Sequence, residues 1–283
     1  MTKLTEENYY QDRQWLSNSR FKAYMDCEAK AKAIDDKEWT DKRDDTALLV
    51  GNYVHSYFES EEAHAKFVDA NKTRMISSRG ATKGELKKEF QVAQNMIDAL
   101  KNDKKFLGLY HGAPGDDVRK EMILEGEIFG IKFKGKVDSI NLTEGYFVDL
   151  KTMKTIRGLE WSDVERKKIP GAAANILGFR YDVQLGLYQE LLRQMGYPNF
   201  VPFVVAVSKE DVPDKAVINL SQYRLDEGLQ FFENNVERVA GIIAGEIKPK
   251  GCGNCDYCRS KRTLDRVINL DDLIAGIFKK NVF

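Results

Sequence analysis

Two aspartates and a lysine lie in neighbouring stretches that alternate apolar and polar residues. Asp138 is near the end of IKFKGKVDSI, and Asp149 and Lys151 lie in YFVDLKT. Residues 149 and 151 share one face of a strand, and a hairpin turn at residues 143–145 would bring Asp138 beside them. Two carboxylates can hold Mg²⁺ or Mn²⁺, and a lysine can stabilise developing negative charge. The pattern indicates metal-dependent phosphodiester hydrolysis; a surface strand with cross-strand ion pairs is the alternative.

Four further residues could complete such a site. His55 follows Gly51 by one helical turn, and its imidazole can bind a metal or simply pack beside tyrosines. The side chain of Leu150 should point to the opposite face from Asp149, while its carbonyl oxygen is a further candidate metal ligand. Gln184 and Tyr188 share a helix face, where they can hydrogen-bond a DNA backbone or form an ordinary polar stripe.

The elements that must position these residues follow from periodicity. Helical spacing predicts helices over residues 20–34 (capped by Ser17 or Ser19), 47–60, 84–101, 181–195, 225–244 and 270–278. Alternation predicts three strands within residues 125–155, with turns near Gly130 and residues 143–145, and two more strands at 200–209 and 215–225. The polar segment 156–178 carries a Pro170-Gly171 break. This order predicts a mixed α/β core without a separating linker.

Composition narrows the class of protein. The 283 residues are 42% hydrophobic, and 44 basic residues balance 44 acidic ones. No segment approaches the roughly 20 apolar residues of a membrane span, and the polar N-terminus has no signal-peptide core, so we expect a cytoplasmic protein without membrane contact. Zero net charge disfavours non-specific coating of nucleic acid, although a local basic groove is sufficient for binding.

One segment concentrates basic residues. Residues 74–88 hold five basic residues and one acidic residue, which makes Arg74, Arg79 and Lys83 candidates for DNA binding. A solvated loop and helix face is the alternative interpretation.

The four cysteines form a possible metal site. Cys252, Cys255 and Cys258 have C-x2-C-x2-C spacing, and Cys27 lies far upstream. Four thiolates make a complete ligand set for Zn²⁺ or for a cubane iron–sulfur cluster. A disulfide framework does not suit a cytoplasmic chain of this length, and the remaining alternative, unrelated buried cysteines, would rarely place three in seven residues.

Four motifs in order resemble the RecB-like branch of the PD-(D/E)XK nuclease superfamily, over about residues 17–260. They are Gly51-x-x-Val54-His55, Gly135-x-x-Asp138, Asp149-x-Lys151 and Gln184-x-x-x-Tyr188. The resemblance implies a restriction-endonuclease-like mixed central sheet flanked by helices. It implies metal binding by His55, Asp138, Asp149 and the Leu150 carbonyl, catalysis by Lys151, and positions beside the active site and DNA for Gln184 and Tyr188.

The same resemblance predicts one nuclease domain over residues 1–283. Its parts are an N-terminal helical part at 17–50, a nuclease core at 51–245, a cysteine segment at 246–262 and a C-terminal helical segment at 263–283.

The segment Ser19-x-Phe21-x-x-Tyr24-x-x-Cys27 is similar to the N-terminal cysteine segment of one subset of these nucleases. In that subset three later cysteines complete a [4Fe-4S] cluster that staples the two ends of the domain. Here only two residues separate Cys255 from Cys258, whereas the last spacing in the subset is longer. The resemblance favours an iron–sulfur cluster, with Zn²⁺ as the alternative.

The chain has no G-x-x-x-x-G-K-[ST] motif, so ATP-driven translocation is not expected. It most resembles phage and prophage exonucleases related to exodeoxyribonuclease VIII. That implies a 5′-to-3′ exonuclease of double-stranded DNA ends, with single-stranded DNA as a further substrate. It would act in recombination inside a bacterial host cell, with a single-strand annealing protein as partner. The alternatives are a CRISPR-associated nuclease that trims DNA ends and a non-catalytic, metal-stapled DNA-binding module. The helix expected at residues 270–278 could form a homo-oligomer interface or pack on its own core.

Overall fold

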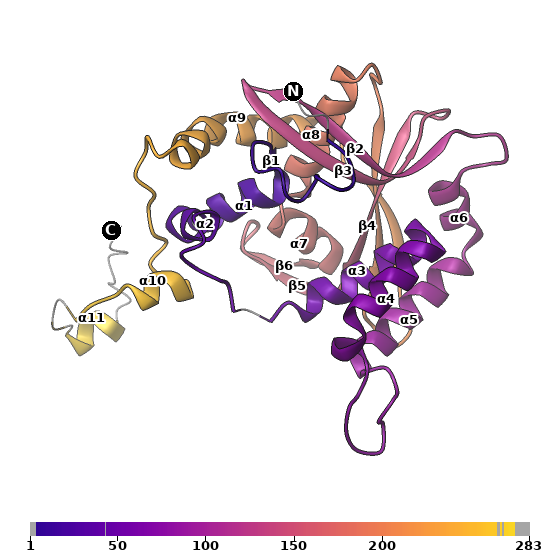
Figure 1. Cartoon of the computed structure of the whole chain (residues 1–283), viewed down its shortest axis with the longest axis horizontal. Coiled ribbons are helices and arrows are strands. Elements are labelled where there is room, and N and C mark those ends of the chain that lie inside the picture. The colour runs from indigo at the N-terminus through magenta and orange to yellow at the C-terminus, as the bar shows by residue number, and fades with distance from the viewer. Residues whose placement is uncertain (1–3, 43, 265–266, 268, 275–283) are drawn as a thin grey trace.

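The central element of the fold is a six-stranded mixed sheet (Figure 1). A computed structural model describes residues 4–42, 44–264, 267 and 269–274. The sheet order is β1-β3-β4-β7-β8, and β2 pairs with β3. The pairs β1·β3 and β4·β7 are parallel, whereas β2·β3, β3·β4 and β7·β8 are antiparallel. The strands are β1 (Leu16–Ser17), β2 (Val118–Ile128), β3 (Ile131–Asn141), β4 (Tyr146–Met153), β7 (Val201–Ser208) and β8 (Lys215–Asn219).

Helices cover both faces of this sheet, as Figure 1 shows. One face packs against α1 (Asn18–Asp26), α2 (Glu28–Asp35), α7 (Gly171–Gly178), α8 (Tyr181–Gln194) and α9 (Gln222–Ala244). The other packs against α3 (Thr46–Glu59), α4 (Glu61–Met75), α5 (Lys88–Lys101) and α6 (Lys104–His111).

The alternation of β7 divides the two cores, because successive strand residues point to opposite faces. Val204 and Ala206 join the first core, and Val205 and Val207 join the second. The mixed α/β class with a helix-flanked mixed sheet is therefore confirmed.

Several predicted elements agree closely with the structure. The three strands expected within residues 125–155 are β2, β3 and β4, although β2 begins earlier, at Val118. The helices expected at 47–60 and 181–195 are α3 and α8. The strand expected at 215–225 ends at Asn219, because Ser221 caps the start of α9 by accepting a hydrogen bond from the Arg224 amide.

Other elements differ from the expectation. The polar segment 156–178 contains a short hairpin of β5 (Leu159–Ser162) and β6 (Lys167–Pro170), followed by α7. Helix α5 begins at Lys88 rather than at residue 84, because Leu86 pairs with Ile76 in an isolated bridge. Helices α4 and α6 were not expected, and α4 buries only Met75, so it has little apolar periodicity.

The helix expected over residues 20–34 is two helices. Ser17 caps α1, and the helix stops at Cys27, whose extended backbone (φ −165°, ψ 104°) also starts α2. This break directs the Cys27 sulfur towards the three C-terminal cysteines, which explains why helical propensity is overridden there.

The C-terminal part continues with α10 (Asp256–Ser260) and α11 (Leu270–Ile274), and residues 275–278 of the last expected helix lie outside the described residues. None of the described helices is long and apolar enough to cross a membrane.

Candidate active site

On one side, β3 has no neighbouring strand over part of its length, and we call this gap in the sheet the opening. Strand β2 pairs with the whole length of β3 on one side. On the other side, β1 pairs with β3 at Phe133 and Lys134, and β4 pairs with it from Ser139 to Asn141. Residues 135–138 therefore have no strand partner on that side within the described part of the chain. The candidate catalytic side chains gather at this opening.

Asp138 and Asp149 face each other where β3 and β4 separate. Continuing the pairing of Ser139 with Val148 by one residue places Asp138 opposite Asp149. At this point the Leu150 amide donates to Asp138 Oδ2 at 2.7 Å, so a side chain replaces the backbone ladder. An extended residue turns its N–H and C=O to the same side. The Leu150 carbonyl is therefore also directed to the opening, as a metal-ligand role would require.

Asp149 is a buried carboxylate with one incompletely satisfied oxygen. Its side chain is only 4% exposed. The Gln184 amide donates to Oδ1 at 2.7 Å. The Lys151 ammonium lies 2.8 Å from Oδ2, an ion-pair distance, but no described residue gives Oδ2 a well-directed hydrogen bond. The charge of this buried oxygen is therefore compensated by the Lys151 ammonium, while its hydrogen-bonding capacity is left incomplete.

His55 reaches the opening from α3, on the opposite face of the sheet from α8. Its Nδ1 lies 3.4 Å from Asp138 Oδ2. Burial disfavours the charged imidazole, but the Asp138 carboxylate outweighs burial and raises the pKa of His55. His55 and Lys151 in turn overcome the effect of burial on Asp138 and lower the pKa of that carboxyl.

The pKa of the second aspartate, Asp149, shifts in the opposite direction from that of Asp138. Burial, together with repulsion from Asp138, outweighs the attraction of Lys151 and raises the pKa of Asp149. Burial opposes the charge of Lys151, but the two carboxylates raise its pKa, so the lysine stays an ammonium. The two carboxylates are thus held close together around one internal cation, the Lys151 ammonium.

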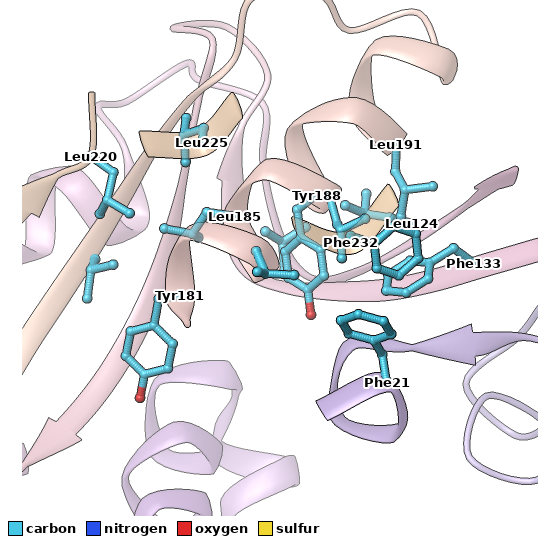
Figure 2. Close-up of a cluster of buried hydrophobic side chains, with 14 of the residues drawn as sticks. Phe21, Leu124, Phe133, Tyr181, Leu185, Tyr188, Leu191, Leu220, Leu225 and Phe232 are labelled. Carbon is cyan, nitrogen blue, oxygen red and sulfur yellow. The ribbon is translucent and has the colours of Figure 1, made fainter. Parts of the chain in front are cut away.

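The position of the Tyr188 ring explains why residue 135, in the Gly135-x-x-Asp138 motif, is a glycine. A Cβ at Gly135 would lie 2.4 Å from Tyr188 Cε1, so only a glycine lets this ring pack against β3. Figure 2 shows Tyr188 in the apolar cluster, with its hydroxyl directed to the same side as that of Tyr181. Tyr188 therefore lies beside the opening as a packed residue of α8. Gly51, by contrast, has only an ordinary contact with Thr152, which does not require a glycine.

The structure adds three residues to the neighbourhood of the site that sequence reasoning missed. The Asn18 amide donates to Gln184 Oε1 at 3.4 Å and supports the glutamine from α1. Lys22 donates to the Phe179 carbonyl at 2.6 Å, and burial, reinforced by Lys151, lowers its pKa. Asn18 and Lys22 lie in α1, far from the motifs, so no local pattern indicates them.

Glu121 is the third missed residue. It lies on β2 opposite Asp138, between the pairs formed by Lys120 and Met122, and has a left-handed backbone (φ 49°). Burial, followed by repulsion from Asp138, raises the pKa of Glu121 to about 7. A positive φ in a strand of alternating residues has no reliable sequence signal.

The three residues expected to bind DNA lie apart from the acidic pair. Arg74, in the last turn of α4, pairs with Asp45, with 3.1 Å between Nη1 and Oδ2. Arg79 and Lys83 are exposed in the loop between α4 and α5, which projects away from the sheet in Figure 1. Among the described residues, no contact joins these three to Asp138 or Asp149.

The four cysteines converge into a metal site that joins the N- and C-terminal parts. Within the described chain they are the one such set of side chains close enough to hold a metal ion as they stand, with all four sulfurs within 4.8 Å of one another. Burial raises the pKa of Cys27 to about 12. Burial acts in the same direction on Cys252, but the amides of Asn254 and Cys255 outweigh it and lower that pKa to about 6.

The comparisons with known proteins agree with this architecture. The sequence matches the PDDEXK-like domain of unknown function DUF3799 over residues 17–261, and the chain belongs to this family. It is also similar to a protein of known crystal structure from Eubacterium rectale, described as a "Putative exonuclease". The two are 32% identical, with a TM-score of 0.82, over 98% of this chain and 100% of that chain. Among the curated proteins, none matches this chain.

Proposed function

We propose that this chain is a divalent-metal-dependent deoxyribonuclease that degrades DNA from its ends. The observation that carries the proposal is the pair of facing carboxylates, Asp138 and Asp149, at an opening of the sheet with Lys151 beside them. Membership of the PDDEXK-like family and similarity to a protein described as an exonuclease support it.

The donor set fits Mg²⁺ or Mn²⁺. Two carboxylates and a backbone carbonyl are the oxygen ligands that these hard cations prefer, and a neutral His55 imidazole could add a nitrogen ligand. Asp149 Oδ2 is a buried oxygen that no well-directed hydrogen bond satisfies among the described residues. The ligand atoms of His55, Asp138 and Asp149 are less closely set than the cysteine sulfurs.

Each residue then has a defined role. Asp138, Asp149, His55 and the Leu150 carbonyl would hold the metal, which would supply Lewis-acid polarisation of the phosphate and activation of water. Lys151, kept cationic by the two carboxylates, stabilises the negative charge that develops on the phosphate. Gln184 holds Asp149 Oδ1 in place, and Tyr188 fixes the face of α8 that presents Gln184.

The finer activity that we propose is 5′-to-3′ digestion of double-stranded DNA ends. Single-stranded DNA would be a further substrate, and the biological setting would be phage-type recombination with a single-strand annealing protein. A test uses linear duplexes labelled at the 5′ or the 3′ end, together with covalently closed circles, in Mg²⁺ or Mn²⁺.

In that test, early release of the 5′ label with intact circles is expected, and Asp138→Asn, which removes one charge at nearly constant shape, serves as the inactive control. Cutting of closed circles would contradict action from ends, and early release of the 3′ label would contradict the polarity. Failure to digest any DNA, or full activity in Asp138→Asn, would contradict the enzyme assignment. DNA binding without cutting would support a non-catalytic module instead.

A further inference from the structure

We propose that Cys27, Cys252, Cys255 and Cys258 hold a single zinc ion, and that an iron–sulfur cluster does not form at this site. The proposal concerns a site away from the acidic pair and does not depend on the nuclease assignment. It rests on the spacing of the sulfur atoms and on the backbone that surrounds them.

The sulfur–sulfur distances match a mononuclear site. Cys27 Sγ lies 3.6 Å from Cys258 Sγ and 3.7 Å from Cys255 Sγ, and Cys252 Sγ lies 4.0 Å from Cys258 Sγ. Four thiolates around one tetrahedral zinc, each at about 2.3 Å, are separated from one another by about 3.8 Å. These three of the six edges match such a tetrahedron, and the other three do not exceed 4.8 Å.

A cubane cluster needs a wider arrangement. Its four thiolates bind four different iron atoms, so an iron–iron edge is added between every two sulfurs and their separation becomes about 6 Å. All four sulfurs here lie within 4.8 Å of one another. The cysteines would therefore have to move apart by more than 1 Å, and the cluster that the sequence resemblance favoured does not fit.

The surrounding backbone leaves little freedom for such a movement. A Cβ at Gly251 would lie 3.0 Å from Cys258 Sγ, so the chain before Cys252 already packs against the sulfurs. Backbone amides also fix three of the sulfurs: the amides of Cys252, Cys255 and Cys258 lie 3.3 to 3.5 Å from the sulfurs of Cys27, Cys252 and Cys255, respectively.

The ion would staple three elements together. Cys27 marks the break between α1 and α2, and Cys258 lies in α10. The neighbouring contacts follow the same path: Glu28 accepts hydrogen bonds from Arg238 of α9 (2.7 Å) and from the Lys250 amide (2.7 Å). Because Cys27 is so far from the others in sequence, one ion closes a very long loop.

Metal analysis of the full chain tests the proposal. The protein would be purified without oxygen from cells supplied with both iron and zinc, and iron, zinc and acid-labile sulfide would be measured together with the visible spectrum. We expect about one zinc per chain, no labile sulfide and no visible colour. Replacement of zinc by Co²⁺ should then produce the intense visible bands of a tetrahedral cobalt–thiolate site.

Several iron atoms with matching sulfide and a brown absorption would overturn the proposal, and so would a protein that takes up neither zinc nor cobalt. Cys258→Ser should lose the zinc or bind it much more weakly, whereas Ser260→Ala, two residues away on α10, should keep it. Asp149→Ala should also keep the zinc, which separates this result from the fate of the nuclease proposal. Full zinc content in Cys258→Ser would contradict the assigned ligand set.

Discussion

The opening beside β3 and the cysteine site both join residues that are far apart in the sequence, but they are held in different ways. At the opening, Asp149 lies between Val148 and Leu150, both completely buried in the core. In residues 246–262, Cys258 is the one buried residue, and Cys252 and Cys255 are half-buried. The first site is held by the packing of the sheet together with hydrogen bonds to Asp138 and Asp149, whereas the second has almost no core of its own.

Because the two sites are held differently, we expect the metal at each site to have a different role. A cation at the acidic pair relieves repulsion between carboxylates that the sheet has already brought together, so we expect it to affect catalysis more than folding. An ion at the cysteines supplies the contacts that the segment lacks, so we expect it to affect folding more than catalysis. Substitutions at the two sites should therefore have opposite signatures.

The largest effect is expected for Asp149→Ala. Loss of one metal ligand should reduce DNA digestion by at least about 10²–10³-fold. The melting temperature should change little, because the substitution also removes a buried charge that Asp138 repels. Nucleotide release and thermal unfolding would be measured on the same preparation. Undiminished DNA digestion would contradict the assignment of Asp149 to the active site. A large loss of stability would contradict the view that the sheet holds this site without a metal.

Cys258→Ser should show the opposite pattern. Without the metal staple, the unfolded chain regains the freedom of a long loop, which is worth about 3–5 kcal/mol. The melting temperature should fall by about 10 °C, while the activity of the protein that remains folded is largely preserved. Ser260→Ala is the matched control. A melting temperature equal to that of the unsubstituted protein would show that the cysteine site does not stabilise the fold.

A third substitution tests the packing that supports the opening. Gly135→Ala would force a Cβ to within 2.4 Å of Tyr188 Cε1, and overpacking of this kind costs about 1–3 kcal/mol. Activity should also fall, because the displaced ring would move α8 and draw Gln184 away from Asp149.

Gly108→Ala is the control for that substitution. Gly108 lies in α6 with nothing near its Cβ position, so alanine should be neutral or stabilise by up to about 1 kcal/mol. Equal stability of the two variants, measured by urea unfolding, would contradict the packing argument.

The smallest effect is expected for Glu121, whose ionisation should make the stability of the protein depend on pH. Its pKa is raised to about 7 in the folded protein, mainly by burial. Between the ordinary pKa and this value the folded state holds a proton that the unfolded state has lost, so stability falls as pH rises through this window. Glu121→Gln removes the titration. Its stability advantage over the unsubstituted protein should grow by about 1–2 kcal/mol between pH 5.5 and 8.5 without added Mg²⁺.

Urea unfolding at the two pH values measures this difference, and Glu144→Gln, an exposed substitution in the β3–β4 turn, is the control. An advantage of Glu121→Gln that stays constant or shrinks would show that Glu121 ionises normally in the fold.

Sequence reasoning located the core of the fold because the signals there are local. Alternation and turn residues defined β2 to β4, and Asp138 and Asp149 followed from the hairpin between β3 and β4. The break at Cys27 could not be seen in the same way, because helix-forming residues surround it and the reason for the break lies with the cysteines at the other end of the chain.

Other features depend on packing between distant elements. The support that Asn18 gives to Gln184 and the position of Glu121 against Asp138 arise only when α1, α8 and β2 meet at the opening. The assignment of the cysteines to iron or zinc also required sulfur–sulfur distances, since spacing alone left both open.

The most direct test of the account compares Mg²⁺ binding with DNA digestion in Lys151→Ala. The ammonium lies 2.8 Å from Asp149 Oδ2, where it competes with a cation for the carboxylate. Removing it should leave Mg²⁺ affinity, measured by calorimetry, unchanged or higher, while digestion falls by at least about 10²-fold because charge on the phosphate is no longer stabilised. A Lys151→Ala protein that digests DNA at the unsubstituted rate, or that loses Mg²⁺ binding, would contradict the roles assigned at this opening.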